Sequence, residues 1–250
     1  MSVELLASLC VAFFLVATLY TTVGHAGASG YLAVMGLAGL AAATMRPTAL
    51  TLNILVALVT VIRFRQARLF SWRGLWPFLL GSVPFAALGG SLRLKDHSYY
   101  ALVGAVLLMS ALILVWRAFG KNLPNDETLM RVKTIPAIFI GAIIGMLSGL
   151  TGTGGGIFLS PTLLFLAWAG PKTTAGIAAP FILVNSTVAL AANFASTREL
   201  PSELPYLAVA ALCGALIGSW LGASKLPSKA LLILLACAMS LAGMKLLLTA

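Results

Sequence analysis

The chain has 250 residues, of which 60% are hydrophobic and 9% are charged, and its formal net charge is +10. Soluble domains usually have about 25% charged residues, so this composition excludes an ordinary soluble protein. A nucleic-acid partner would need a basic surface on a soluble domain, and the positive charge instead fits contact with anionic membrane lipids.

Apolar segments recur along the whole chain, and most are long enough to cross about 30 Å of hydrocarbon as a helix. The apolar runs are continuous rather than alternating, which favours helices over a barrel. We therefore predict an all-α, polytopic membrane protein with about ten apolar segments. In chain order they are expected near 3–22, 30–45, 48–62, 74–92, 99–118, 134–150, 156–170, 174–195, 206–223 and 229–248.

Two glycine-rich motifs divide the chain into similar halves. The glycines of GHAGASG (24–30) have the same spacing as those of GLTGTGG (149–155), at an offset of 125 residues. We predict two membrane repeats, 1–119 and 134–250, joined by a hydrophilic cytoplasmic linker at 120–133. With five segments in each repeat, the second repeat would be inverted in the membrane, as in many secondary transporters.

The basic residues predict the orientation. Eleven of the 16 Lys and Arg residues fall in links expected on one side, and five fall on the other. Cytoplasmic loops carry the excess of basic residues, so the first side is expected in the cytoplasm and both termini outside.

The second glycine motif predicts an interrupted helix. GLTGTGGG (149–156) matches neither the P-loop nor the G-x-G-x-x-G pattern, so nucleotide binding is poorly supported. Three consecutive glycines cover every face of a helix, whereas a packing stripe needs only one. We expect the next helix to begin near Gly156 and to present unpaired N–H groups to an anion.

Two other sets of glycines recur every four residues and predict close helix packing instead of a site. They are Gly141, Gly145 and Gly149, and Gly214, Gly218 and Gly222.

A few polar residues lie inside the apolar segments. Asn53, Asn185 and Ser186 fall in the third and eighth segments, where an amide either donates to an oxyanion or ties two helices together. His25, inside the first glycine motif, either contacts substrate, carries a proton or caps a helix end. No carboxylate lies at the centre of a segment, which argues against a cation carrier, a metal site and a hydrolase.

The chain resembles the sulfite exporter TauE/SafE family, also called the toluene sulfonate uptake permease family. The resemblance rests on GLTGTGGGIFLSPTLLF (149–165) and TTAGIAAPFILVNSTVAL (173–190), with a weaker copy of both in the first half. It implies a multi-pass transporter of the bacterial inner membrane that moves sulfite, sulfoacetate or other organosulfonates, without a cofactor. His25 departs from the family pattern, which leaves the substrate open.

The glycine motifs and the polar positions together give the predicted substrate-binding residues. They are His25, Gly27, Ser29, Gly30, Asn53, Thr151, Gly152, Thr153, Gly154, Gly155, Gly156, Asn185 and Ser186. A passive anion channel and a non-transporting membrane scaffold subunit are the alternative functions. The expected partners are a small anion and membrane lipids, and the sequence leaves open whether the chain forms a homo-oligomer.

Overall fold

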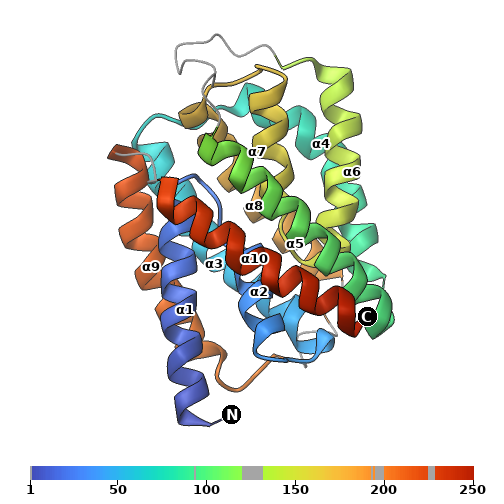
Figure 1. Cartoon of the computed structure of the whole chain (residues 1–250). Coiled ribbons are helices and arrows are strands. Elements are labelled where there is room, and N and C mark those ends of the chain that lie inside the picture. The colour runs from blue at the N-terminus through green and yellow to red at the C-terminus, as the bar shows by residue number, and fades with distance from the viewer. Residues whose placement is uncertain (1, 93, 120–131, 193, 195–199, 225–228) are drawn as a thin grey trace.

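A computed structural model describes the chain except residues 1, 93, 120–131, 193, 195–199 and 225–228. The described residues form ten α-helices in one bundle (Figure 1). The helices are α1 (Val3–Thr21), α2 (Ala28–Leu37), α3 (Ala42–Gln66), α4 (Trp72–Ser91), α5 (Asp96–Phe119), α6 (Thr134–Thr151), α7 (Gly156–Phe165), α8 (Pro171–Ala192), α9 (Leu204–Ser224) and α10 (Lys229–Thr249). Within the described residues, six helices are long and apolar enough to cross a membrane, namely α1, α3, α5, α6, α8 and α9. The all-helical, multi-pass prediction is thus confirmed.

The two short helices end earlier than predicted. The sequence predicts segments at 30–45 and 156–170, but α2 and α7 have ten residues each. After each helix the chain reverses through a residue with positive φ, which is Gly39 at 75° and Ala167 at 50°. The N–H groups beyond each reversal bond to carbonyls of the last helical turn, and this closes the helix.

The third helix begins earlier than predicted. The sequence places its start at residue 48, after Arg46 and Pro47, whereas α3 begins at Ala42. Proline lacks an N–H group, so near the start of a helix it removes one backbone hydrogen bond without preventing the helix. The correction has a functional consequence, because it places the guanidinium of Arg46 on a membrane-crossing helix.

Helices α3 and α8 form the centre of the bundle and run antiparallel. Asn53 of α3 contacts Ser186 of α8, while Phe64, further along α3, packs against Ala175 and Ala179, earlier in α8. In their most apolar windows, 56% of the α3 residues and 61% of the α8 residues are buried, against 28–44% for the other four candidate spans. Side chains on these two helices therefore reach the interior at mid-membrane.

Two outer helix pairs pack closely and in parallel. A Cβ added to the glycine stripe of α6 would meet the backbone of α4 at Phe78, Ser82 and Ala86, in the same order along both helices. Likewise, a Cβ added to the stripe of α9 would meet the backbone of α1 at Phe14, Thr18 and Thr22. These contacts confirm that both glycine stripes serve helix packing.

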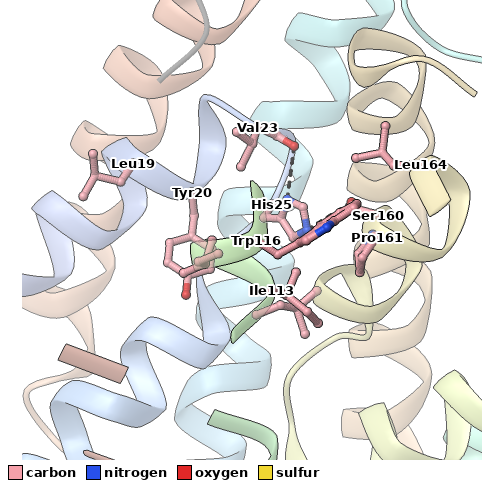
Figure 2. A pocket seen from close by; sticks show the side chains of 11 residues that line it. Leu19, Tyr20, Val23, His25, Ile113, Trp116, Ser160, Pro161 and Leu164 are labelled. Atoms are coloured by element: carbon pink, nitrogen blue, oxygen red, sulfur yellow. Dashed lines mark hydrogen bonds between the residues drawn. The ribbon is translucent and has the colours of Figure 1, made fainter. Parts of the chain in front are cut away.

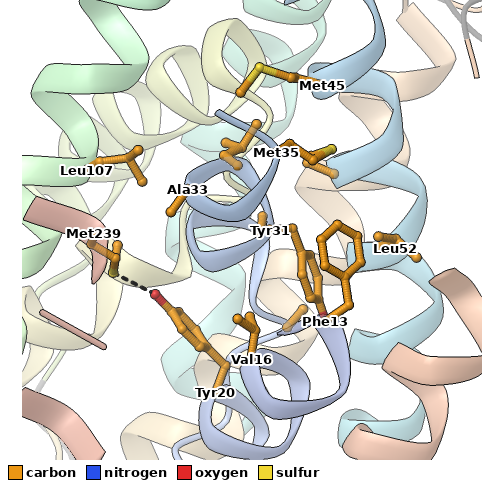
Figure 3. Close-up of a cluster of buried hydrophobic side chains, with 14 of the residues drawn as sticks. Phe13, Val16, Tyr20, Tyr31, Ala33, Met35, Met45, Leu52, Leu107 and Met239 are labelled. Carbon is orange, nitrogen blue, oxygen red and sulfur yellow. Dashed lines mark hydrogen bonds between the residues drawn. The ribbon is translucent and has the colours of Figure 1, made fainter. Parts of the chain in front are cut away.

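The antiparallel pair α5 and α10 crosses the bundle in front of α2 (Figure 1). Figure 3 shows part of the core beside it, where the Phe13 and Tyr31 rings lie 4.9 Å apart between centroids. In the same cluster the Tyr20 hydroxyl donates a hydrogen bond to the Met239 sulfur at 2.9 Å. Helix α10 also holds the other end of α2, because Lys245 Nζ donates to the carbonyls of Gly36 and Leu37. A cation at a helix C-terminus complements the helix dipole.

We expect Gly218→Leu to lower the stability of the protein, because the side chain would force α9 away from Thr18 and Thr21 of α1. Overpacking of this kind costs about 1–3 kcal/mol or more. Thermal unfolding in detergent measures the change. Leu216→Ala is the control, because Leu216 lies on the same helix with 49% of its surface exposed. Equal thermal stability of Gly218→Leu and wild type would contradict the packing role.

Candidate functional site

The first glycine motif is a true break in a helix. Helix α1 ends at Thr21, and the N–H groups of Gly24 and His25 bond to carbonyls of its last turn at 3.2 and 3.0 Å. Gly24 has a φ of 79°, and a Cβ there would meet the backbone of Ala175 in α8. The chain therefore turns at Gly24 because only glycine has both the required φ and the required size.

The second glycine motif is also a break, as the sequence predicts. Helix α6 ends at Thr151 and α7 begins at Gly156, with positive φ at Gly152, Gly154 and Gly155. The N–H group of Gly152 bonds to the carbonyl of Ser148 at 2.8 Å and closes α6.

The structure corrects the register between the two motifs. Gly24 and Gly152 are the left-handed residues that follow α1 and α6, and Gly27 and Gly155 are the left-handed residues before α2 and α7. Both pairs are 128 residues apart, so the predicted offset of 125 residues is wrong. The predicted partner of Gly24, Gly149, lies inside α6 and packs on α4. Three glycines at equal spacing looked equivalent in the sequence although one belongs to a helix stripe.

The two breaks meet at the centre of the bundle. The His25 Nε2 atom, in the first break, lies 2.9 Å from the carbonyl oxygen of Gly156, at the start of α7. The Asn53 Oδ1 atom accepts a hydrogen bond from the N–H of Ala28, at the start of α2, at 3.1 Å. Its Nδ2 group donates to the Ser186 hydroxyl at 3.2 Å. Residues from both halves of the chain thus form one buried polar cluster.

A small cavity with room for about one water molecule lies within this cluster. Its lining residues are Tyr20, His25, Ala26, Gly27, Ala28, Ser29, Thr153, Ile157 and Ile182. The first N–H groups of a helix have no acceptor inside that helix, and both α2 and α7 begin at this cavity. The hydroxyl groups of Tyr20 and Ser29 also lie in its wall and are hydrogen-bonded to each other at 3.0 Å.

A second, larger and mainly apolar cavity adjoins the first. It has room for one or two water molecules and lies between the end of α1, the second half of α5 and α7 (Figure 2). The two cavities share Tyr20, His25 and Ile157 in their walls. Figure 2 shows the His25 imidazole with its bond to the Val23 carbonyl, and Ser160 near it on α7. The polar side chains of Tyr20 and His25 thus lie where the apolar cavity borders the two helix breaks.

The charge around the cavities favours an anion over a cation. No Asp, Glu, Lys or Arg lines either of these two cavities, and His25 is in the wall of both. Within the described part of the chain, the carboxylates of Glu4, Asp96 and Glu203 lie at or near helix ends and away from the cluster. The helix starts at α2 and α7 contribute partial positive charge.

The predicted site residues divide into two groups. His25, Gly27, Ser29 and Thr153 line the small cavity. The residues that contact these four or each other are Asn53, Thr151, Gly154, Gly156 and Ser186. The others pack nearby without lining either cavity, and they are Gly30, Gly152, Gly155 and Asn185. Gly30 faces Val16, and Gly155 packs against Ile144 and Phe181.

Asn185 differs from Asn53 in what its amide contacts. Its Nδ2 group donates to the Phe181 carbonyl of its own helix at 2.9 Å. Its buried Oδ1 atom has no hydrogen-bond partner among the described residues. Asn53 therefore ties α2, α3 and α8 together, whereas the described contacts of Asn185 remain within α8.

Sequence reasoning missed Arg46, which has only 8% of its surface exposed. Its guanidinium donates to the carbonyls of Gly89, Gly90 and Leu92 at the end of α4, at 2.6–2.9 Å. Its side chain also packs against Gly152 in the second break. The signal was present, because extending the third segment back over residues 42–47 would have placed an arginine within a span, where charges mark functional regions.

Comparison with known proteins gives a consistent result. The sequence model of the family described as "Sulfite exporter TauE/SafE" matches residues 9–246. The "Probable membrane transporter protein y4hK" of Sinorhizobium fredii is 38% identical over 242 residues, which covers 96% of this chain and 97% of that protein. No solved structure matches the chain significantly.

We expect Asn53→Ala to destabilise the protein more than Asn185→Ala does. The first change removes the hydrogen-bond acceptor of the Ala28 N–H and the donor to the Ser186 hydroxyl, and each buried unsatisfied group costs about 1–3 kcal/mol. The second removes one bond to a helix carbonyl. Thermal unfolding of both variants in one detergent makes the comparison, and a larger loss for Asn185→Ala would contradict this assignment.

Proposed function

Because the chain belongs to the sulfite exporter TauE/SafE family, we propose that it is a secondary transporter for a small sulfur-containing anion. The proposed substrates are sulfite, sulfoacetate or another organosulfonate, carried across the bacterial inner membrane. The family is one of membrane transporters and not of enzymes, so no catalytic residues are assigned.

The meeting of the two helix breaks is the observation that carries this proposal. Helices α2 and α7 both begin at a buried cavity, and first-turn N–H groups together with hydroxyl groups surround it. Interrupted backbone at membrane depth is tolerated where it lines a cavity or meets a ligand. In transporters built this way, helix starts of broken helices bind anionic groups of the substrate near mid-membrane.

We further propose that residues 1–119 and 134–250 are inverted-topology repeats joined by 120–133, of which 120–131 lie outside the described residues. Three features support this. The short helices α2 and α7 have equal length and begin 128 residues apart. Helix α1 of the first repeat packs in parallel on α9 of the second, and α6 of the second repeat packs in parallel on α4 of the first. A two-fold relation between the repeats requires this exchange of partners. Helices α1 and α6 also start at opposite ends of the bundle (Figure 1).

Counterflow in proteoliposomes tests the function against its two alternatives. Vesicles loaded with unlabelled sulfoacetate or sulfite should take up the labelled anion transiently, because a carrier exchanges substrate across the membrane. A passive channel would dissipate the gradient without counterflow. A scaffold subunit would neither transport nor bind any anion in a thermal-shift screen of sulfite, sulfoacetate, taurine, thiosulfate, sulfate and acetate.

Gly154→Ala should weaken anion binding by about ten- to hundredfold, the value of one hydrogen bond to a charged group. A Cβ at Gly154 would press on Asn53 and Ser186. Gly39→Ala is a matched control, since both glycines have a φ of 75° and a Cβ at Gly39 would meet nothing within 4 Å. Calorimetric titration with the best anion of the screen measures both. Equal affinities would show that the second break is not part of the site.

The topology can be tested with single cysteines in a variant that lacks the three native ones. A cysteine at Arg68 should be labelled from the cytoplasm only, and one at Val3 from outside only, because the basic residues place the 63–73 link inside. Membrane-impermeant maleimide applied to cells and to inverted vesicles reports the side. Labelling of Val3→Cys from the cytoplasm would rule out external termini.

A further inference from the structure

Both ring nitrogens of His25 face carbonyl oxygens. Nδ1 lies 3.1 Å from the carbonyl oxygen of Val23, and Nε2 lies 2.9 Å from that of Gly156. Nε2 also lies 3.1 Å from the Ser160 hydroxyl. A carbonyl oxygen only accepts hydrogen bonds, and a neutral imidazole has a single N–H group. Both carbonyl bonds therefore form together only when the ring carries two protons.

Loss of one proton has a defined alternative partner in the structure. With the proton kept on Nδ1, the bond to Val23 remains, and the Ser160 hydroxyl donates to the bare Nε2 atom. In this tautomer the Gly156 carbonyl faces a lone pair and loses its bond to His25. Loss of the proton from Nε2 thus breaks the bond between the first helix break and the start of α7, which is 131 residues away in the sequence.

This bond lies beside a cavity. His25 and Ser160 line the mainly apolar cavity between α1, α5 and α7, which has room for one or two water molecules. Pro161, also in its wall, has no N–H group, so one backbone hydrogen bond within the ten-residue α7 is missing. Helix α7 is therefore held at its start by the His25 bond while a cavity lies along its side.

The surroundings of His25 make its charge dependent on an anion. Tyr20, whose ring lies 6.4 Å from the imidazole between centroids, is the titratable group facing it from α1, and a phenol is neutral near pH 7. The residues that α2, α5, α7 and α8 contribute to the two cavity walls carry no ionisable group. The buried cation Arg46 is bonded to the carbonyl end of α4 and lines neither cavity. A bound anion in either cavity would favour the imidazolium form of His25, because an opposite charge nearby stabilises the charged state.

We propose that His25 carries the coupled proton, so that one proton and one monovalent anion cross the membrane together. The inference rests on the proposed function, because it needs an anion in the cavity at the two breaks. Proton and anion each favour the binding of the other, as linkage requires. His25 takes a proton from water on one side with the anion, holds α7 through Gly156, and releases the proton to water on the other side when the anion leaves. Histidine suits this role because it changes charge near neutral pH.

Proteoliposomes with a pH-sensitive dye inside test the coupling, with methanesulfonate as a probe that stays singly charged throughout. Addition of methanesulfonate outside should acidify the lumen of wild-type vesicles. An imposed gradient, acid outside, should drive up to about tenfold accumulation per pH unit, the limit for one-to-one electroneutral coupling. His25→Gln keeps hydrogen-bonding groups but cannot titrate, so whatever methanesulfonate uptake remains in this variant should neither acidify the lumen nor exceed equilibration under an imposed pH gradient.

Ser160→Ala gives a second readout that a purely structural role would not move. The change removes the donor to neutral imidazole, so the proton should be held more firmly and the midpoint of the pH–transport profile should shift upward. Wild-type counterflow without lumen acidification would overturn the proton coupling but leave the proposed function standing. Accumulation by His25→Gln equal to wild type would also overturn it. Absence of wild-type counterflow for methanesulfonate and for every anion of the screen would instead refute the proposed function.

Discussion

A helix that stops inside a hydrocarbon layer leaves N–H and C=O groups that water cannot satisfy, and this constraint governs the centre of the molecule. Asn53 of α3 accepts a hydrogen bond from the start of α2. The His25 ring, in the break after α1, contacts the carbonyl of Gly156 at the start of α7. The two breaks therefore meet, and the polar cavity lies where they do.

Glycine serves two different purposes in this frame. In α6 and α9 it removes side-chain bulk, so that α4 and α1 approach at backbone distance. At Gly24, Gly152, Gly154 and Gly155 it supplies the positive φ that stops one helix and starts the next. Gly149 and Gly152 are three residues apart and belong to different classes. Close packing of the outer pairs holds α3 and α8 in place, and these helices carry Asn53 and Ser186 to the cavity.

Among the described residues, no carboxylate is buried, and one arginine on a central helix, Arg46, is buried. The guanidinium of Arg46 donates its hydrogen bonds to carbonyls at the C-terminal end of α4. Its positive charge therefore offsets the negative end of the α4 dipole beside the second break. The cavity itself is surrounded by helix starts, hydroxyl groups and one histidine. A site of this kind stabilises an anion through dipoles and hydrogen bonds, and the single titratable group near neutrality lies where the two halves touch.

The sequence by itself determined that the chain folds in a membrane. It also determined the ten helices, both helix breaks and the packing role of the glycine stripes. These depend on local properties, namely apolar length, glycine spacing and helix propensity, which a single chain segment carries. Only the tertiary structure decided the register of 128 residues, the inclusion of Arg46 in α3, and the difference between Asn53 and Asn185. Each of these depends on which groups face one another across α3, α7 and α8. Hydrogen bonds between residues more than 100 positions apart, such as His25 with Gly156, have no signature in the local sequence, because the partner is chosen by helix packing.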